Sequence, residues 1–158
     1  MIKTVNKAIV GVDPGLSGAL ALVGPKLLTA RMPVRMNGKK RVVDAAEVSA
    51  LLKAWGPTHA VIENVWASPQ MGVVSAFSFG HSKGVVEAAV AAGIAPENVY
   101  MVAPAVWKAR MGVTAEKQTS IKLAMKLFPG LGKLTADEAE AVLLAVYGML
   151  FLAQPKGL

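Results

Sequence analysis

Four carboxylates stand out in the sequence because each lies in or beside a strongly apolar segment. Asp13 follows the apolar run 8–12, Glu63 ends a second such run, and Asp137 and Glu140 open a third near the C-terminus. Burying an ionised carboxylate without a partner is costly, and a carboxylate in such a place is typical of a site that holds a cation or a protonated ligand. The chemistry to consider first is therefore cation binding by oxygen ligands.

Asp13 alone leaves two interpretations open, a turn and a ligand site. A proline and a glycine follow it, and Asp-Pro-Gly is common turn chemistry. Glu63 favours the site, because in a strand the side-chain period of two places it on the face shared by Val61 and Val65. Two carboxylates brought together in a low-dielectric interior need a neutralising partner, which indicates a shared cation.

Asp137 and Glu140 are three residues apart, so in a helix they project from nearly the same face. That face continues as an apolar stripe, and we expect both carboxylates to point inward at the sheet. The alternative is an acidic first turn behind a Thr135 cap that satisfies the helix dipole, and this is the interpretation we prefer for Glu138.

An all-oxygen ligand set without histidine or cysteine suits Mg²⁺ or Mn²⁺ and not zinc. The chain has no cysteine, which also excludes a disulfide framework. Two such ions about 4 Å apart would position a water on a phosphodiester and stabilise the leaving oxygen, as in two-metal nucleases.

The net charge of +7, from 17 Lys and Arg against 10 Asp and Glu, indicates a polyanionic partner. Solubility is the competing explanation, because a chain with 54% hydrophobic residues also needs net charge to stay dispersed. The basic residues cluster at 35–41 and at 108–126, which favours nucleic acid.

Hydrophobic periodicity predicts one α/β domain over residues 1–158. Strands over 5–13, 18–23 and 27–32 would form an antiparallel meander, and strands over 59–65 and 99–102 would complete a mixed sheet. A basic loop is expected at 35–41. Helices are predicted at 43–55, 73–92, 103–111, 115–127 and 136–152.

The predicted helix 73–92 carries a small residue at every fourth position, which lets another backbone approach closely. One interpretation is packing of this helix on its own sheet, and the other is a face for a second subunit. The residues are Ala76, Gly80, Gly84, Ala88 and Ala92.

No segment predicts a membrane span or export. The longest apolar stretch, 141–153, is shorter than the roughly 20 residues that cross a bilayer. The N-terminus has no apolar signal region, so a cytoplasmic location is expected.

Four motifs resemble, in order and spacing, those of the RuvC-type Holliday junction resolvases of the ribonuclease H-like superfamily. The resemblance covers essentially the whole chain, and residues 104–117 also resemble the family's stretch with two functional lysines. The motifs are Val-Gly-Val-Asp-Pro-Gly with the following Ser-Gly-Ala (10–19), Ile-Glu-Asn-Val-Trp (62–66), Gly-His-Ser-Lys-Gly (80–84) and Asp-Glu-Ala-Glu-Ala (137–141).

The resemblance implies a ribonuclease H-like fold, a mixed five-stranded sheet with helices on both faces. It implies a homodimeric endonuclease, without a nucleotide cofactor, that makes paired nicks in four-way DNA during recombination or repair in a bacterial or phage-infected cell. Two Mg²⁺ ions per active site are implied, with Mn²⁺ able to substitute. By position the metal ligands would be Asp13, Glu63, Asp137 and Glu140, and Lys108 and Lys117 would contact the scissile phosphate.

Trp66 falls where the family places an aromatic residue near the junction centre, and an exposed indole can stack on an unpaired base. Its alternative is a loop aromatic folded onto the helix 73–92. The other expected DNA-binding residues are Lys39, Lys40, Arg41 and Lys83, besides Lys108 and Lys117.

One departure from the family concerns the last acidic position, commonly Asp and here Glu140, which leaves open whether Glu138 or Glu140 completes the metal site. A broader branched-DNA or flap nuclease with this fold also remains open. Four intact carboxylates argue against a catalytically weak junction-binding module. Actin-like kinases and ATPases share the Asp-x-Gly hairpin, but they need two lobes where this chain has one.

Overall fold

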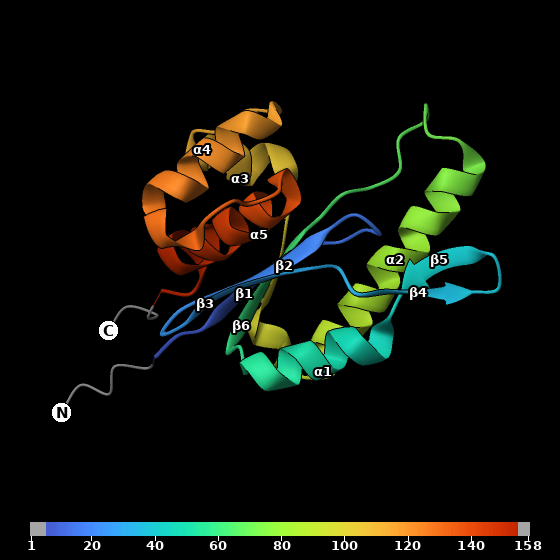
Figure 1. Ribbon diagram of the computed structural model, residues 1–158, viewed down its shortest axis with the longest axis horizontal. Coiled ribbons are helices and arrows are strands. Elements are labelled where there is room, and N and C mark those ends of the chain that lie inside the picture. The colour runs from blue at the N-terminus through green and yellow to red at the C-terminus, as the bar shows by residue number, and fades with distance from the viewer. Residues whose placement is uncertain (1–5, 155–158) are drawn as a thin grey trace.

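The computed structural model describes residues 6–154 and is built around one five-stranded sheet (Figure 1). The antiparallel meander of three strands and the two parallel additions match the expectation, although the predicted start of the first strand at Val5 lies outside the described residues. The strands are β1 (Ile9–Asp13), β2 (Ala19–Val23), β3 (Leu27–Arg31), β6 (His59–Glu63) and β7 (Val99–Val102), in the order β3-β2-β1-β6-β7.

Helices cover both faces of the sheet, as predicted (Figure 1). One layer contains α1 (Ala45–Trp55) and α2 (Val73–Ala91), and the other contains α3 (Pro104–Met111), α4 (Lys117–Leu127) and α5 (Ala136–Tyr147). Neighbouring residues of β1 enter different cores: Val10 packs on the α1 and α2 side, whereas Ile9 packs on the α5 side. A sheet buried on both faces explains why these strands are almost wholly apolar.

Helix α5 lies directly against the middle of β1. A Cβ at Gly11 would collide with the backbone of Ala141 and Ala145, so only glycine allows this close approach. The contact sets the height of α5 above the sheet. It brings the first turn of the helix over the carboxyl end of β1.

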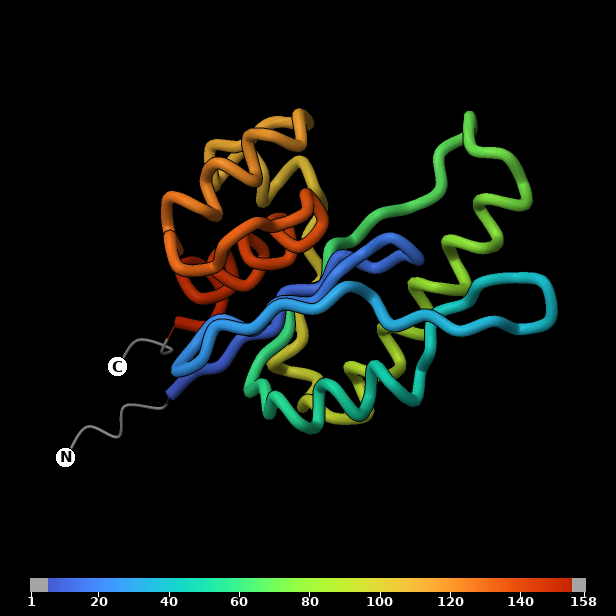
Figure 2. The backbone as a smooth tube through the Cα atoms, viewed as in Figure 1, coloured from blue at the N-terminus to red at the C-terminus, as the bar shows by residue number. Residues whose placement is uncertain are grey.

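The expected basic loop at 35–41 is wrong, because this segment is a β-hairpin. Strands β4 (Val34–Asn37) and β5 (Lys40–Val43) pair in antiparallel register as a separate two-stranded sheet. Gly38 adopts φ +60° at the turn, and Asn-Gly is a strong hairpin signal. The prediction of a loop gave more weight to the basic residues of the segment than to this signal. Figure 2 shows the hairpin projecting beside α2, against which β5 lies.

Helix ends also differ from the sequence prediction by two residues or more at three places. Asp44 is the cap of α1, accepting hydrogen bonds from the backbone N–H groups of Ala46 and Glu47. Helix α4 begins at Lys117, and α5 ends at Tyr147 before a π-helical turn. Short 3₁₀ turns cover Pro96–Asn98 and Pro129–Leu131, and the π-helical turn covers Gly148–Leu152.

Candidate metal centre

The four predicted carboxylates lie near the carboxyl end of the central strands, and three of them, Asp13, Asp137 and Glu140, form a close cluster. Strands β1 and β6 are parallel neighbours, with Val12 opposite Ile62. Asp13 directly follows Val12 and Glu63 directly follows Ile62, so the two carboxylates lie side by side at the ends of their strands. The carboxyl ends of parallel strands are a common place for ligand sites in α/β sheets.

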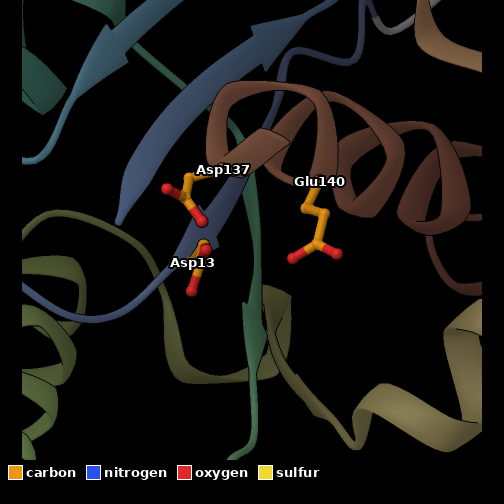
Figure 3. A group of neighbouring side chains, drawn as sticks. All are labelled: Asp13, Asp137 and Glu140. Carbon is orange, nitrogen blue, oxygen red and sulfur yellow. The ribbon is translucent and has the colours of Figure 1, made fainter. Parts of the chain in front are cut away.

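The first turns of α5 supply the remaining two carboxylates from above the sheet. Figure 3 shows Asp137 and Glu140 hanging from this helix toward Asp13. Oxygen atoms of these three residues lie within 4.8 Å of one another. The predicted inward orientation of both helix carboxylates is therefore confirmed, and three oxygen ligands already surround one common space.

The electrostatics of this cluster favour a bound cation. Burial, followed by the charges of Glu63, Asp137 and Glu140, raises the pKa of Asp13 from 3.8 to about 7. Burial also raises the pKa of Glu63, although the hydrogen bond from Trp107 opposes the rise. A divalent cation would offset the repulsion that causes these shifts, and an all-carboxylate donor set suits Mg²⁺ or Mn²⁺.

Helix α3 holds two of the four carboxylates through consecutive residues. The indole Nε1–H of Trp107 donates to Oε2 of Glu63 at 2.7 Å, and Nζ of Lys108 donates to Oε1 of Glu140 at 2.7 Å. Trp107 has no exposed surface. Sequence reasoning assigned Trp107 no role; its place beside a motif lysine was the available signal, because a buried indole needs a partner for its N–H.

Lys117 approaches the cluster from another side, at the start of α4. Its Nζ lies 3.7 Å from Oδ1 of Asp137, and its side chain is 68% exposed. Both lysines singled out in the sequence thus lie beside the acidic cluster. Their contact with a scissile phosphate stays a prediction.

Glu138 belongs to the helix cap. Its carboxylate accepts hydrogen bonds of 2.8 Å from the backbone N–H and the hydroxyl of Thr135, while its own N–H donates to Thr135 Oγ1 at 3.2 Å. This reciprocal arrangement is a capping box. The cap interpretation is confirmed, and Glu140 is the residue that lies with Asp13 and Asp137.

Trp66 combines features of both interpretations offered for it. The indole is 73% exposed, yet Nζ of Lys83 on α2 lies 4.1 Å from the ring centroid. Lys83 is itself buried and lies 2.9 Å from Oε1 of Glu87. Lys83 therefore makes a cation–π contact with the face of the indole. A direct contact between Lys83 and DNA stays a prediction.

The small-residue stripe of α2 faces outward over most of its length. Gly80, Gly84, Ala88 and Ala92 are exposed, and a Cβ added at Gly80 or Gly84 would meet no atom within 4 Å. Packing on its own sheet does not explain these four residues. The alternative, a face for a second subunit, stays open.

No protein-family model matches the sequence, and no curated protein matches it significantly. Solved structures do match the fold. Thermus thermophilus RuvC in complex with a Holliday junction substrate gives a TM-score of 0.62 at 17% identity, over 90% of this chain and 92% of that chain. A second Thermus thermophilus RuvC structure gives 0.57 at 19% identity, over 90% and 95%.

The yeast mitochondrial Holliday junction resolvase gives a TM-score of 0.50 at 9% identity, over 91% of this chain and 78% of that chain. At these identities the likeness concerns the fold. The chain has an α/β fold like that of these RuvC structures. In the described residues, no helix is both long enough and apolar enough to span a membrane.

Proposed function

We propose that this protein is a metal-dependent DNA endonuclease that resolves Holliday junctions by paired nicks in four-way DNA, during recombination or repair. The observation that carries the proposal is the cluster of Asp13, Asp137 and Glu140, whose oxygens lie within 4.8 Å of one another. It occupies the carboxyl end of the central strands in a fold shared with RuvC bound to a Holliday junction.

The four carboxylates would hold Mg²⁺, with Mn²⁺ as a substitute and two ions per active site. Bound ions of this kind activate a water for attack on a phosphodiester and stabilise the leaving oxygen. Asp13 would be a central ligand of this set, because Glu63, Asp137 and Glu140 all act on its pKa and therefore lie close to it.

The two lysines would have different tasks. Lys108 is largely buried and already paired with Glu140 at 2.7 Å, so its first task is to orient that carboxylate. Lys117 is exposed and lies at the looser distance of 3.7 Å from Asp137. Its ammonium group can turn to a phosphate as a mobile point charge.

Paired nicks require two active sites, which a homodimer through α2 would supply. The exposed glycines of α2 leave room for the backbone of a second helix. Trp66 lies beside the same helix, so a junction centre held across the dimer would be within reach of the exposed indole.

A cleavage panel tests the proposal. Four-way, three-way, flap and duplex DNA are incubated with the protein and Mg²⁺ or Mn²⁺, with Asp13→Asn as the control. Preferential cutting of the four-way junction by the unsubstituted protein alone is expected. Equal cutting of flaps and junctions would favour a broader branched-DNA nuclease over a resolvase. If all of these DNA substrates stay uncut, the proposed nuclease function is wrong.

A further inference from the structure

A groove of about 900 Å³ runs between the β4–β5 hairpin and the N-terminal half of α2. This volume is at the upper end of the range of ligand sites. The hairpin that forms one wall was not expected from the sequence, so the groove is a feature that only the structure reveals.

The two walls of the groove differ in chemistry. The hairpin wall carries the cations Lys39, Lys40 and Arg41, and the helix wall carries Val73, Val74 and Phe77. These three apolar side chains are 74–86% exposed. Among the described residues that line the groove, none is acidic.

The groove leads to the acidic cluster. Leu16, Val74 and Ser78 line it, and they also line the adjoining hollow that contains Asp13 and Asp137. A DNA strand lying in the groove would therefore continue directly to the candidate metal centre. This continuity connects the groove with the reaction proposed above.

We propose that the groove binds an unpaired stretch of a DNA strand, with its bases on Phe77 and Val74 and its phosphates on the basic hairpin. The inference rests on the proposed nuclease function and deepens it. The substrate would then be a branched DNA that offers unpaired nucleotides beside the cleaved bond.

An unpaired strand fits this groove better than duplex DNA does. A duplex presents its phosphates outward and keeps the faces of its bases stacked, so it would leave Phe77 and Val74 uncovered. An unpaired strand offers both a charged edge and flat apolar faces, and single-strand binding sites combine a basic track with aromatic stacking in this way.

Fluorescence anisotropy with a labelled oligothymidylate tests the groove, using the full chain in the cleavage-deficient Asp13→Asn background. Phe77→Ala should weaken binding about tenfold, as expected for loss of one stacked base. Its matched control is Met36→Ala, because Met36 is an exposed apolar residue of the same hairpin and does not line the groove. Circular dichroism checks folding, which loss of so exposed a side chain should not affect.

The double substitution K39A/K40A tests the phosphate contacts. Two lost contacts should lower the slope of log affinity against log salt by about 1.4 for a single strand. The control is K26A/K53A, which removes two exposed lysines outside both basic clusters. Phe77→Ala should weaken binding of a blunt duplex of equal length less than it weakens binding of the oligothymidylate.

Three results would overturn the groove proposal. The first is equal binding by Phe77→Ala and Met36→Ala, and the second is an unchanged salt slope in K39A/K40A. The third is a loss of self-association in Phe77→Ala without loss of oligothymidylate binding, which would assign the groove to a second copy of the chain. Cleavage of a four-way junction by the unsubstituted protein, measured in parallel, separates failure of the groove from failure of the nuclease function.

Discussion

The indole of Trp107 donates a 2.7 Å hydrogen bond to Glu63 from a position with no solvent exposure. The next residue, Lys108, pairs with Glu140 at the same distance. One turn of α3 thus fixes two of the four carboxylates, whereas Asp13 and Asp137 are positioned by the strand and by α5. The four carboxylates are therefore positioned by the ends of the strands, by α5 and by α3.

Trp107→Phe should weaken Mn²⁺ binding about tenfold, as is typical when a group that orients a metal ligand is lost. The substitution keeps most of the buried ring but removes the N–H donor from Glu63. Isothermal titration calorimetry measures the affinity without any need for activity. Trp55→Phe is the matched control, because Trp55 lies on α1; equal affinities in the two variants would contradict a positioning role for Trp107.

Without metal, the protein should lose stability as the pH rises. Between pH 3.8 and about 7 the unfolded chain releases the proton of Asp13 while the folded chain retains it, so the stabilising contribution present at low pH is lost through this range. The raised pKa of Glu63 acts in the same direction. Urea unfolding in EDTA should show a decrease of roughly 1–4 kcal/mol between pH 5 and pH 8.

Asp13→Asn should flatten this pH dependence and stabilise the metal-free protein at pH 8, since it removes one of the repelling charges. Glu97→Gln, which changes an exposed carboxylate outside the cluster, should leave the decrease intact. Added Mg²⁺ should restore stability to the unsubstituted protein at pH 8. A pH dependence that Asp13→Asn leaves unchanged would show that the cluster does not cause it.

Lys117→Ala should reduce cleavage more than binding, by about tenfold or more in the rate at saturating DNA. An ammonium group that meets the phosphate during the reaction contributes little to overall affinity, which is spread over the basic surface. Single-turnover cleavage and anisotropy on the same junction separate the two quantities. Lys122→Ala, on the same helix, is the control, and equal losses of rate and affinity in Lys117→Ala would count against a catalytic role.

Gly84→Leu should convert a dimer to a monomer. The glycine is exposed and a Cβ there meets no atom of its own chain, so the protomer should remain folded; leucine is also a better helix former by roughly 0.8–1 kcal/mol. Sedimentation velocity measures the change. Ala50→Leu on the exposed side of α1 controls for added apolar surface, and a protein that sediments as a monomer before substitution would refute the dimer itself.

The sheet and the carboxylates could be predicted from the sequence because their signals are local. Apolar runs give the strands, and Asp13 and Glu63 interrupt that pattern where the chain leaves the core. The spacing of Asp137 and Glu140 then determines a helix face. Each of these inferences needs only a few neighbouring residues.

The remaining features depend on contacts between distant segments. The bond between Trp107 and Glu63 joins residues 44 positions apart, and no local pattern reveals it. The hairpin was missed for a different reason, since the basic residues around Gly38 suggested a solvated loop although Asn37-Gly38 is a turn signal. The position of Lys83 beneath Trp66 likewise appears only when α2 and the segment after β6 are brought together.

The most direct test of the central claim is the mapping of nicks in a synthetic four-way junction with a fixed crossover, incubated with the protein and Mg²⁺. We expect paired nicks, symmetrically placed in two opposing strands and rejoinable by ligase, that are absent in EDTA and in Asp13→Asn. An uncut junction, or the same products from Asp13→Asn, would contradict the assignment of the acidic cluster as the active site of a junction resolvase.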